Sequence, residues 1–275
     1  MKEACELLWE SREEAKIIAG GTDLVIGLRS GVLKPRSLID ITGIEELRKI
    51  EEQDGMIWVG AAVTHHEIAS SPLITRYGRV LAEAASWIGS PQIRNLGTVG
   101  GNIVNASPAA DTVPPLMAMN ATVRVVSREG EREIPLDRLF RRPYESNLKS
   151  HEILAQVKFA KLSSSARSSY IRLARRGAMA IARMSVAVIL RSEKGRMEDV
   201  RISVGSVTPT PQRMSEAESV LEARPPDEEG LRLAAHQISE RMIRQSGVRP
   251  STSYKKPVVE ALFIRAMRRA LEGMI

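Results

Sequence analysis

Apolar residues recur along the chain with two different periods, which separates the predicted helices from the predicted strands. Residues 1–14 and 72–87 carry apolar side chains three and four positions apart, the spacing of an amphipathic helix. Residues 121–127 and 152–159 alternate apolar with polar side chains, as half-buried antiparallel strands do. Residues 56–63 are almost wholly apolar and predict a buried strand. This half of the chain therefore combines helices with a mixed or antiparallel sheet.

Two short apolar segments near the beginning of the chain predict a smaller lobe. Residues 17–19 are typical of the end of a buried strand, and residues 37–41 of a second short strand. An apolar helix face at residues 24–28 lies between them. This order predicts a small βαβ lobe that ends near residue 50, so that residues 51–162 form a second lobe.

A serine-rich run at residues 161–169 changes the composition and predicts a linker. Beyond it the pattern predicts three strands and then three helices. The strands are expected at residues 170–176, 185–191 and 200–207. The helices are expected at residues 212–222, 227–242 and 257–271. We therefore expect an α+β protein of two domains, residues 1–162 and 168–275, the second built from a three-stranded antiparallel sheet and a helix bundle.

A single cysteine, Cys5, limits the chemistry that the chain can hold. One thiol excludes an internal disulfide and any iron–sulfur cluster held by four cysteines of this chain. The hydrophobic content of 43% is that of a globular protein, and no apolar run reaches the length of a membrane span. The first residues lack the pattern of an export signal, and we therefore expect a cytoplasmic protein.

Positive charge is concentrated in the second half of the chain. Residues 1–160 contain 19 Lys and Arg against 21 Asp and Glu, a net charge of −2, whereas residues 161–275 contain 21 against 12, a net charge of +9. A basic half can indicate nucleic-acid binding. Aromatic residues make up only 4% of the chain, however, and no basic stretch alternates with stacking rings. We therefore expect the basic half to face cofactor phosphates, an acidic partner or solvent.

Two glycine pairs are the strongest candidates for a binding site. Gly100 and Gly101 lie among small hydroxyl and amide residues, where no bulky side chain shields the backbone. Gly20 and Gly21 follow a predicted strand and precede a predicted helix. Glycine reaches positive φ and lets other groups approach its N–H donors, and bare N–H groups in a turn bind phosphate. Neither pair belongs to a GxGxxG or P-loop motif, but two such nests together suit a pyrophosphate.

The dipeptide His65–His66 invites a metal interpretation, which we reject. A zinc site of the HExxH type needs its second histidine four residues after the first, and adjacent histidines on a helix point about 100° apart. We therefore expect a helix N-terminus capped by Thr64, with both imidazoles at the surface. We also expect no metal site and no catalytic side chain, because no candidate base or nucleophile has suitable partners.

These stretches resemble the FAD-binding subunit of the molybdenum hydroxylases, the medium subunit of carbon monoxide dehydrogenase-like, nicotinate dehydrogenase-like and xanthine dehydrogenase-like enzymes. In that family an AGG[TH][DS] loop and a T[IV]GGN loop hold the FAD pyrophosphate, and this chain reads AGGTD at residues 19–23 and TVGGN at residues 98–102. The runs IGSPQIRN and SPAAD are also similar to the family. The resemblance continues through YIRLARRGAMAIA and RISVGSVTPTPQR and so covers nearly the whole chain.

The resemblance implies a flavin-binding domain of the vanillyl-alcohol-oxidase-like type and specific FAD contacts. Ile88 and Leu154 would flank the flavin ring, Arg172 would place a cation near the ring or the phosphates, and Ile181 would lie near the ring edge. The chain departs from the family at Ala180, where many members have an aspartate. The expected cofactor-binding residues are Ile17, Ile18, Ala19, Gly20, Gly21, Thr22, Asp23, Leu24, Ile88, Thr98, Val99, Gly100, Gly101, Asn102, Ser107, Asp111, Leu154, Arg172 and Ile181.

The function implied by the resemblance is that of an electron relay. A large subunit with a molybdenum cofactor would oxidise the substrate, two [2Fe–2S] clusters of a small subunit would carry the electrons, and FAD on this chain would pass them to an external acceptor. The implied assembly is a dimer of heterotrimers. The residues themselves leave two alternatives open: a stand-alone FAD-dependent oxidase, and a basic nucleotide- or nucleic-acid-binding protein without redox activity.

Overall fold

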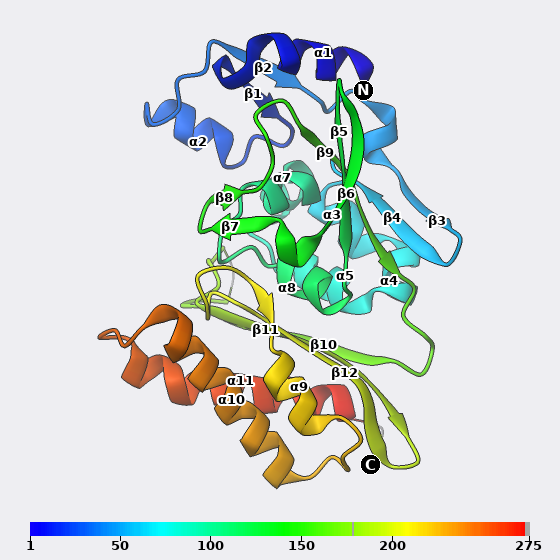
Figure 1. Cartoon of the computed structure of the whole chain (residues 1–275), viewed down its shortest axis with the longest axis vertical. Coiled ribbons are helices and arrows are strands. Elements are labelled where there is room, and N and C mark those ends of the chain that lie inside the picture. Colours follow the sequence, from blue (N-terminus) through cyan, green and yellow to red (C-terminus); the bar gives the residue numbers. More distant parts are fainter. Residues whose placement is uncertain (178, 273–275) are drawn as a thin grey trace.

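The computed structural model describes residues 1–177 and 179–272, and its elements form three groups stacked along the long axis of the molecule (Figure 1). The N-terminal group, in blue, lies at one end. The middle group, in cyan and green, carries the longest stretch of the chain. The C-terminal group, from yellow-green to red, lies at the other end.

The N-terminal group is built around two short parallel strands. Its elements are α1 (Lys2–Ser11), η1 (Arg12–Glu14), β1 (Ala15–Ile18), α2 (Leu24–Arg29), β2 (Ser37–Asp40) and η2 (Glu45–Arg48). β1 pairs with β2 in parallel, with Ala15 opposite Ser37. Parallel neighbours need a crossover connection, and the segment containing α2 provides it. Leu8 of α1 packs with the strands in a small core that also contains Ile153 and Ala155 of the middle group.

The middle group is an antiparallel sheet of five strands with the order β3-β4-β9-β5-β6. Its strands are β3 (Ile50–Gln53), β4 (Met56–Gly60), β5 (Thr122–Ser127), β6 (Gly130–Pro135) and β9 (Ile153–Ala160). Its helices are α3 (His65–Ser70), α4 (Pro72–Tyr77), α5 (Arg79–Ser86), α6 (Pro91–Leu96), α7 (Val99–Val104), α8 (Val113–Ala118) and η3 (Leu136–Arg138). A separate two-stranded ribbon consists of β7 (Phe140–Arg142) and β8 (Glu145–Ser146).

The C-terminal group is a four-stranded antiparallel sheet covered by three helices. The strands β10 (Arg167–Leu173), β11 (Met184–Glu193), β12 (Arg196–Gly205) and β13 (Gln212–Arg213) pair in that order. The helices are α9 (Ser215–Leu221), α10 (Glu228–Ser246) and α11 (Thr252–Leu271).

Both faces of the C-terminal sheet are buried, because alternate residues of its strands enter two different cores. Ala187 and Ile189 join the core of the middle group, whereas Val186 and Val188 join the core formed with α9, α10 and α11. The sheet therefore lies between the middle group and these helices (Figure 1). Over the described ranges, no helix is both long enough and apolar enough to cross a membrane.

The structure confirms an α+β fold with antiparallel sheets and corrects two expected elements. The helix expected at residues 72–87 is two helices that meet at Gly78, where a Cβ would lie 3.0 Å from the Phe159 ring. The helix expected from residue 212 begins at Ser215, because Gln212 and Arg213 pair with β12 as a fourth strand. The expectation of three strands in this sheet was therefore wrong.

Candidate functional site

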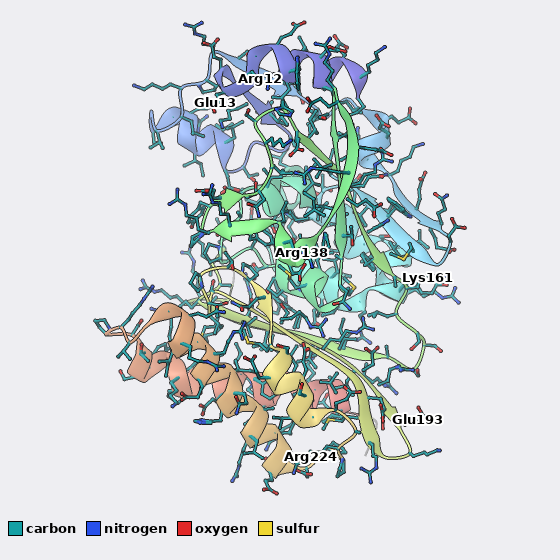
Figure 2. The ribbon with its side chains drawn as sticks, in the orientation of Figure 1. Arg12, Glu13, Arg138, Lys161, Glu193 and Arg224 are labelled. Atoms are coloured by element: carbon teal, nitrogen blue, oxygen red, sulfur yellow. The ribbon has the colours of Figure 1, made fainter. Side chains whose placement is uncertain are left out.

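A cavity of about 930 Å³ is lined by both the N-terminal and the middle group. Its walls come from the loop after β1, from α7 and from the segment before β9. Arg12 and Glu13, which also line it, lie where the chain leaves α1 (Figure 2). Sites for small molecules and cofactors usually have volumes of roughly 300–1,000 Å³, so this cavity suits a large ligand.

Most of the predicted cofactor-binding residues meet at this cavity. Those that line it are Ile17, Ala19, Gly20, Gly21, Thr22, Asp23, Leu24, Ile88, Thr98, Gly100, Gly101, Asn102 and Leu154. Ile18 and Val99 belong to the same segments but are not part of the lining. The remaining predicted residues, Ser107, Asp111, Arg172 and Ile181, lie outside the lining.

The first glycine loop, residues 19–23, presents unused backbone donors. The N–H groups of Gly20, Gly21, Thr22 and Asp23 make no hydrogen bond with the described residues. Gly21 has a φ of +68°, which favours glycine. Consecutive free N–H groups in such a turn form an anion-binding concavity. The loop therefore has the donors that the sequence predicts.

The second glycine loop, residues 98–102, is the N-terminus of α7, and its donors are already used. Gly100 N donates to Ala61 O at 2.9 Å, Gly101 N to Thr98 Oγ1 at 3.1 Å, and Asn102 N to Thr98 O at 3.0 Å. Both glycines have ordinary φ values. The expectation of bare N–H groups and positive φ at this loop was therefore wrong, because Thr98 caps a helix here.

The two adjacent glycines of the second loop have different surroundings. A Cβ on Gly100 would lie 2.6 Å from Ala61 Cβ, so Gly100 is needed for packing. A Cβ on Gly101 would meet only Thr98 Oγ1, at 3.1 Å, and Gly101 is exposed and lines the cavity. The absence of a side chain at Gly101 therefore leaves space inside the cavity. The first loop also touches the segment just before the second, since a Cβ on Gly20 would lie 1.8 Å from Leu96 O.

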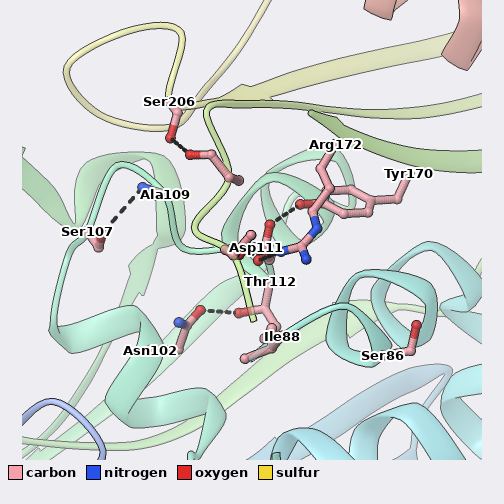
Figure 3. A network of polar contacts seen from close by, with 12 residues as sticks. Ser86, Ile88, Asn102, Ser107, Ala109, Asp111, Thr112, Tyr170, Arg172 and Ser206 are labelled. Carbon is pink, nitrogen blue, oxygen red and sulfur yellow. Dashed lines mark hydrogen bonds and ion pairs between the residues drawn. The ribbon is translucent and has the colours of Figure 1, made fainter. Parts of the chain in front are cut away.

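Asp111 and Arg172 contact each other in a buried network that joins the middle and C-terminal groups (Figure 3). Tyr170 Oη donates to Asp111 Oδ1 at 2.5 Å, and Arg172 Nη1 donates to Asp111 Oδ2 at 2.9 Å. Burial raises the pKa of Asp111, although Tyr170 and Arg172 act in the opposite direction. Burial and the neighbouring Asp111 carboxylate raise the pKa of Tyr170, so its hydroxyl remains a donor. A buried carboxylate with these two donors holds the Arg172 guanidinium in place.

Hydrogen bonds connect this network to the cavity wall. Thr112 Oγ1, one residue after Asp111, donates to Asn102 Oδ1 at 2.6 Å (Figure 3). Within the same segment, Ser107 Oγ accepts from Ala109 N at 3.3 Å. Pro108 O accepts from Ser206 N, in the C-terminal group, at 2.8 Å. Loop 107–111 is therefore held from both sides.

The apolar residues expected around a flavin ring lie in three different environments. Leu154 is buried, whereas Ile88 is half-buried and its carbonyl accepts from Arg94 Nη1 at 2.9 Å. Ile181 is 80% exposed. Arg172 Nη1 donates to the carbonyl of Ala180 at 3.2 Å, which ties the segment before Ile181 to the buried network.

His65 is a cavity residue that the sequence analysis placed at the surface. Its side chain is only 3% exposed and lines the cavity, whereas His66 is exposed. The Nδ1 atom of His65 is buried and has no hydrogen-bond partner among the described residues. Burial and the nearby positive charge of Arg94 lower the pKa of His65 to about 4. The helical spacing of His65 and buried Ile68, three residues apart, is the sequence signal that could have identified it.

Tyr170 was not expected as a partner of Asp111, because a tyrosine within a strand is most often a core residue. Across residues 1–177 and 179–272, no group of three or more His, Cys, Asp or Glu side chains is arranged to hold a metal ion. The site therefore offers backbone donors, apolar walls and a neutral imidazole rather than metal ligands.

Two family models match the chain. The model for the FAD binding domain in molybdopterin dehydrogenase matches residues 1–161. The model for the CO dehydrogenase flavoprotein C-terminal domain matches residues 169–270.

Individual proteins are similar over nearly the full length. The 6-hydroxypseudooxynicotine dehydrogenase complex subunit alpha of Paenarthrobacter nicotinovorans is 31% identical, covering 98% of this chain and 92% of that protein. The nicotinate dehydrogenase FAD-subunit of Eubacterium barkeri is 32% identical, covering 96% and 90%. Among solved structures, a carbon monoxide dehydrogenase from Hydrogenophaga pseudoflava that lacks the Mo-pyranopterin moiety of its cofactor matches with a TM-score of 0.93. That match has 28% identity and covers 98% of this chain and 94% of the other.

Proposed function

The chain belongs to the FAD-binding subunits of the molybdenum hydroxylases, the family of carbon monoxide dehydrogenase and xanthine dehydrogenase, and we propose that it is the electron-transfer subunit of such a complex. In this proposal it takes electrons from [2Fe–2S] clusters of a partner subunit and passes them, through FAD, to an external acceptor. The observation that carries the proposal is the cavity that both glycine loops line, with free N–H donors in the first loop and open space at Gly101 in the second.

The residues at the cavity fit FAD. The free N–H groups of residues 20–23 suit the anionic pyrophosphate, and Gly101 leaves room beside it. Ile88 and Leu154 provide apolar walls for the flavin ring and exclude water from it. When bound, FAD supplies the redox chemistry, because a flavin exchanges both one and two electrons. The chain itself needs to bind, orient and shield it.

We assign the contacts with FAD to the predicted residues that line the cavity. The predicted residues outside the lining hold neighbouring segments in place. Arg172 and Asp111 act as an ion pair, and the Tyr170 hydroxyl holds the Asp111 carboxylate in position by a hydrogen bond. Their part is to tie loop 107–111 to the segment before Ile181. We further propose a domain division at residues 162–168, with residues 1–162 carrying most of the FAD site.

The proposed partners are a small subunit with two [2Fe–2S] clusters and a large subunit with the molybdenum cofactor, in a cytoplasmic dimer of heterotrimers. Two named relatives support this assembly, since one is called the subunit of a complex and the other a FAD-subunit. Cys5 is the only cysteine, and it is buried, so the clusters must come from another chain.

Purification from the native source tests the proposal directly. The absorption spectrum is expected to show flavin, about one FAD per chain, released by acid precipitation because the binding is non-covalent. Iron and molybdenum are expected to co-purify with the chain.

Different results would favour the alternatives. A chain that purifies alone, without iron or molybdenum, and oxidises an organic substrate by itself would be a stand-alone FAD oxidase. A chain without flavin that retains nucleotides or nucleic acid would contradict both redox interpretations.

A further inference from the structure

Three cationic side chains gather around the beginning of α11. Lys255 Nζ, from the first turn of this helix, donates to the carbonyl of Ser206 at 3.2 Å. The Ser206 hydroxyl donates to the carbonyl of Ala182 at 3.1 Å, and Arg183 is the next residue in the chain. Arg249 belongs to the turn that leads into α11. Lys255, Arg183 and Arg249 therefore form one positively charged cluster.

No acidic side chain of the described residues neutralises this cluster. Lys255, Arg183 and Arg249 make no ion pair with an Asp or Glu of that part of the chain, whereas Lys256 pairs with Glu240 at 2.7 Å. Burial and the like charges of Arg249 and Arg183 lower the pKa of Lys255. The first turn of α11 adds the positive end of the helix dipole and contains no acidic residue. The like charges repel one another, and an acidic surface placed against them would relieve the repulsion.

Exposed apolar side chains lie beside the same cations. Tyr254 is 47% exposed, and the Arg183 guanidinium lies 5.7 Å from the centre of its ring. Val248, directly before Arg249, is 82% exposed. Ile181, two residues before Arg183, is also exposed. Protein interfaces are enriched in aromatic residues and Arg and depleted of acidic residues, so this composition favours contact with another protein over capture of a small anion.

Hydrogen bonds tie the cluster to segments of the proposed FAD site. Ser206, which accepts from Lys255, donates its N–H to the carbonyl of Pro108 in loop 107–111 at 2.8 Å. Arg172 Nη1 donates to the carbonyl of Ala180, in the segment that leads to the cluster, at 3.2 Å. The protein must bring any group that exchanges electrons with FAD close to the flavin. A subunit that docks on the cluster would lie against segments that hold the site.

We propose that this surface is the docking site for an acidic face of the small [2Fe–2S] subunit. The inference rests on the proposed function. Among the partners in that proposal, the small subunit passes electrons directly to FAD, whereas the molybdenum subunit reaches FAD through the clusters. Opposite charges steer the small subunit into one orientation, and the apolar side chains exclude water from the contact. The docking surface consists of Ile181, Arg183, Val248, Arg249, Tyr254 and Lys255.

Charge reversal at exposed positions separates docking from folding. Arg183→Glu and Arg249→Glu each reverse one exposed charge of the docking surface. Arg265→Glu is the matched control, because it makes the same charge change at an exposed position of α11 that lies about 15 Å along the helix from Lys255. Each variant is produced in the native host and purified as the complex. Mass photometry on dilution at low and high salt measures the dissociation constant of the small subunit.

Each reversal in the docking surface is expected to weaken binding of the small subunit about tenfold at low salt, and the double variant about 100-fold. Added salt is expected to reduce these differences, because it screens the charges. Arg265→Glu is expected to stay within about twofold of the wild type. Flavin per chain and the unfolding temperature are expected to remain unchanged in every variant, since none of these side chains lines the cavity.

Three results would overturn the assignment of this surface. One is an unchanged dissociation constant in the double variant. Another is equal weakening by Arg265→Glu, which would indicate a general effect of net charge. The third is loss of the large subunit while the small one stays bound, which would give the surface to a different partner. A wild-type chain that purifies without flavin or iron would instead refute the proposed function, so the two failures are distinguishable.

Discussion

The two glycine loops look alike in the sequence but contribute different features to the cavity. In the first loop, residues 19–23, one glycine has positive φ and four consecutive N–H groups make no hydrogen bond within the described part of the chain. In the second, residues 98–102, both glycines are helical and their N–H groups are bonded inside the protein. The first loop therefore provides donors, whereas the second provides space, because Gly101 adds no side chain to the cavity.

The difference shows that a glycine pair does not by itself indicate a phosphate nest. Gly100 is present because Ala61 leaves no room for a Cβ, which is a packing requirement. Thr98 directs its hydroxyl to Gly101 N and so removes the donor that the motif seemed to offer. Tertiary contact between Gly20 and Leu96 brings the first loop against the segment that precedes the second.

The largest expected effect comes from filling the space at Gly101. Gly101→Val is expected to weaken FAD binding by about 100-fold, because forcing methyl groups into an occupied site costs about 3 kcal/mol. The thermal unfolding temperature is expected to remain close to that of the wild type, since only Thr98 Oγ1 lies near the new Cβ. Flavin absorbance per chain and calorimetry measure the two quantities.

Gly100→Ala is the matched control for this substitution. Its Cβ would lie 2.7 Å from Ala61 O, so we expect a lower unfolding temperature. Normal flavin content in Gly101→Val would show that the second loop does not border the cofactor.

The next effect concerns pH, because the second loop adjoins a buried imidazole. The pKa of His65 is about 4 in the folded protein and about 6.5 when unfolded, so the unfolded state binds more protons between these values. Stability is then highest above about pH 6.5 and falls by about 3 kcal/mol as the pH is lowered to about 4.

The His65→Leu variant is expected to lose about 3 kcal/mol less unfolding free energy than the wild type as the pH is lowered to about 4. Urea unfolding at several pH values between about 4 and 7.5 measures the unfolding free energy of the wild type and of the variant. The difference between the two proteins cancels the contribution of all other titrating groups. If the unfolding free energies of the two proteins change in parallel with pH, the pKa of His65 is the same in the folded and the unfolded state.

The smallest effect tests how the C-terminal group holds loop 107–111. Tyr170→Phe removes one of the two side-chain donors to buried Asp111 and is expected to cost about 2 kcal/mol of unfolding free energy. Tyr254→Phe, at an exposed position, is the control and is expected to cost little. If chemical unfolding gives equal values for both, the Tyr170 hydroxyl does not hold Asp111.

Local patterns predicted much of the fold but not its exceptions. The strands β5 and β9 lie where alternation predicts them, and β11 and β12 overlap the strands expected at residues 185–191 and 200–207. The break at Gly78 was not predicted: the glycine has a non-helical φ of −150°, and the ring of Phe159, which is distant in the sequence, leaves little room for a side chain there. The short strand Gln212–Arg213 depends in the same way on its pairing with β12.

The sequence by itself determined which segments form the site, because motifs such as AGGTD and SPAAD are contiguous and carry their chemistry in residue type and order. Only the tertiary structure decided which groups in those segments are available. The Ala61 carbonyl occupies the Gly100 donor, Arg172 pairs with Asp111, and a nitrogen of buried His65 has no partner among the described residues. The physical reason is that burial and hydrogen-bond pairing depend on neighbours up to tens of residues away, which a contiguous motif does not specify.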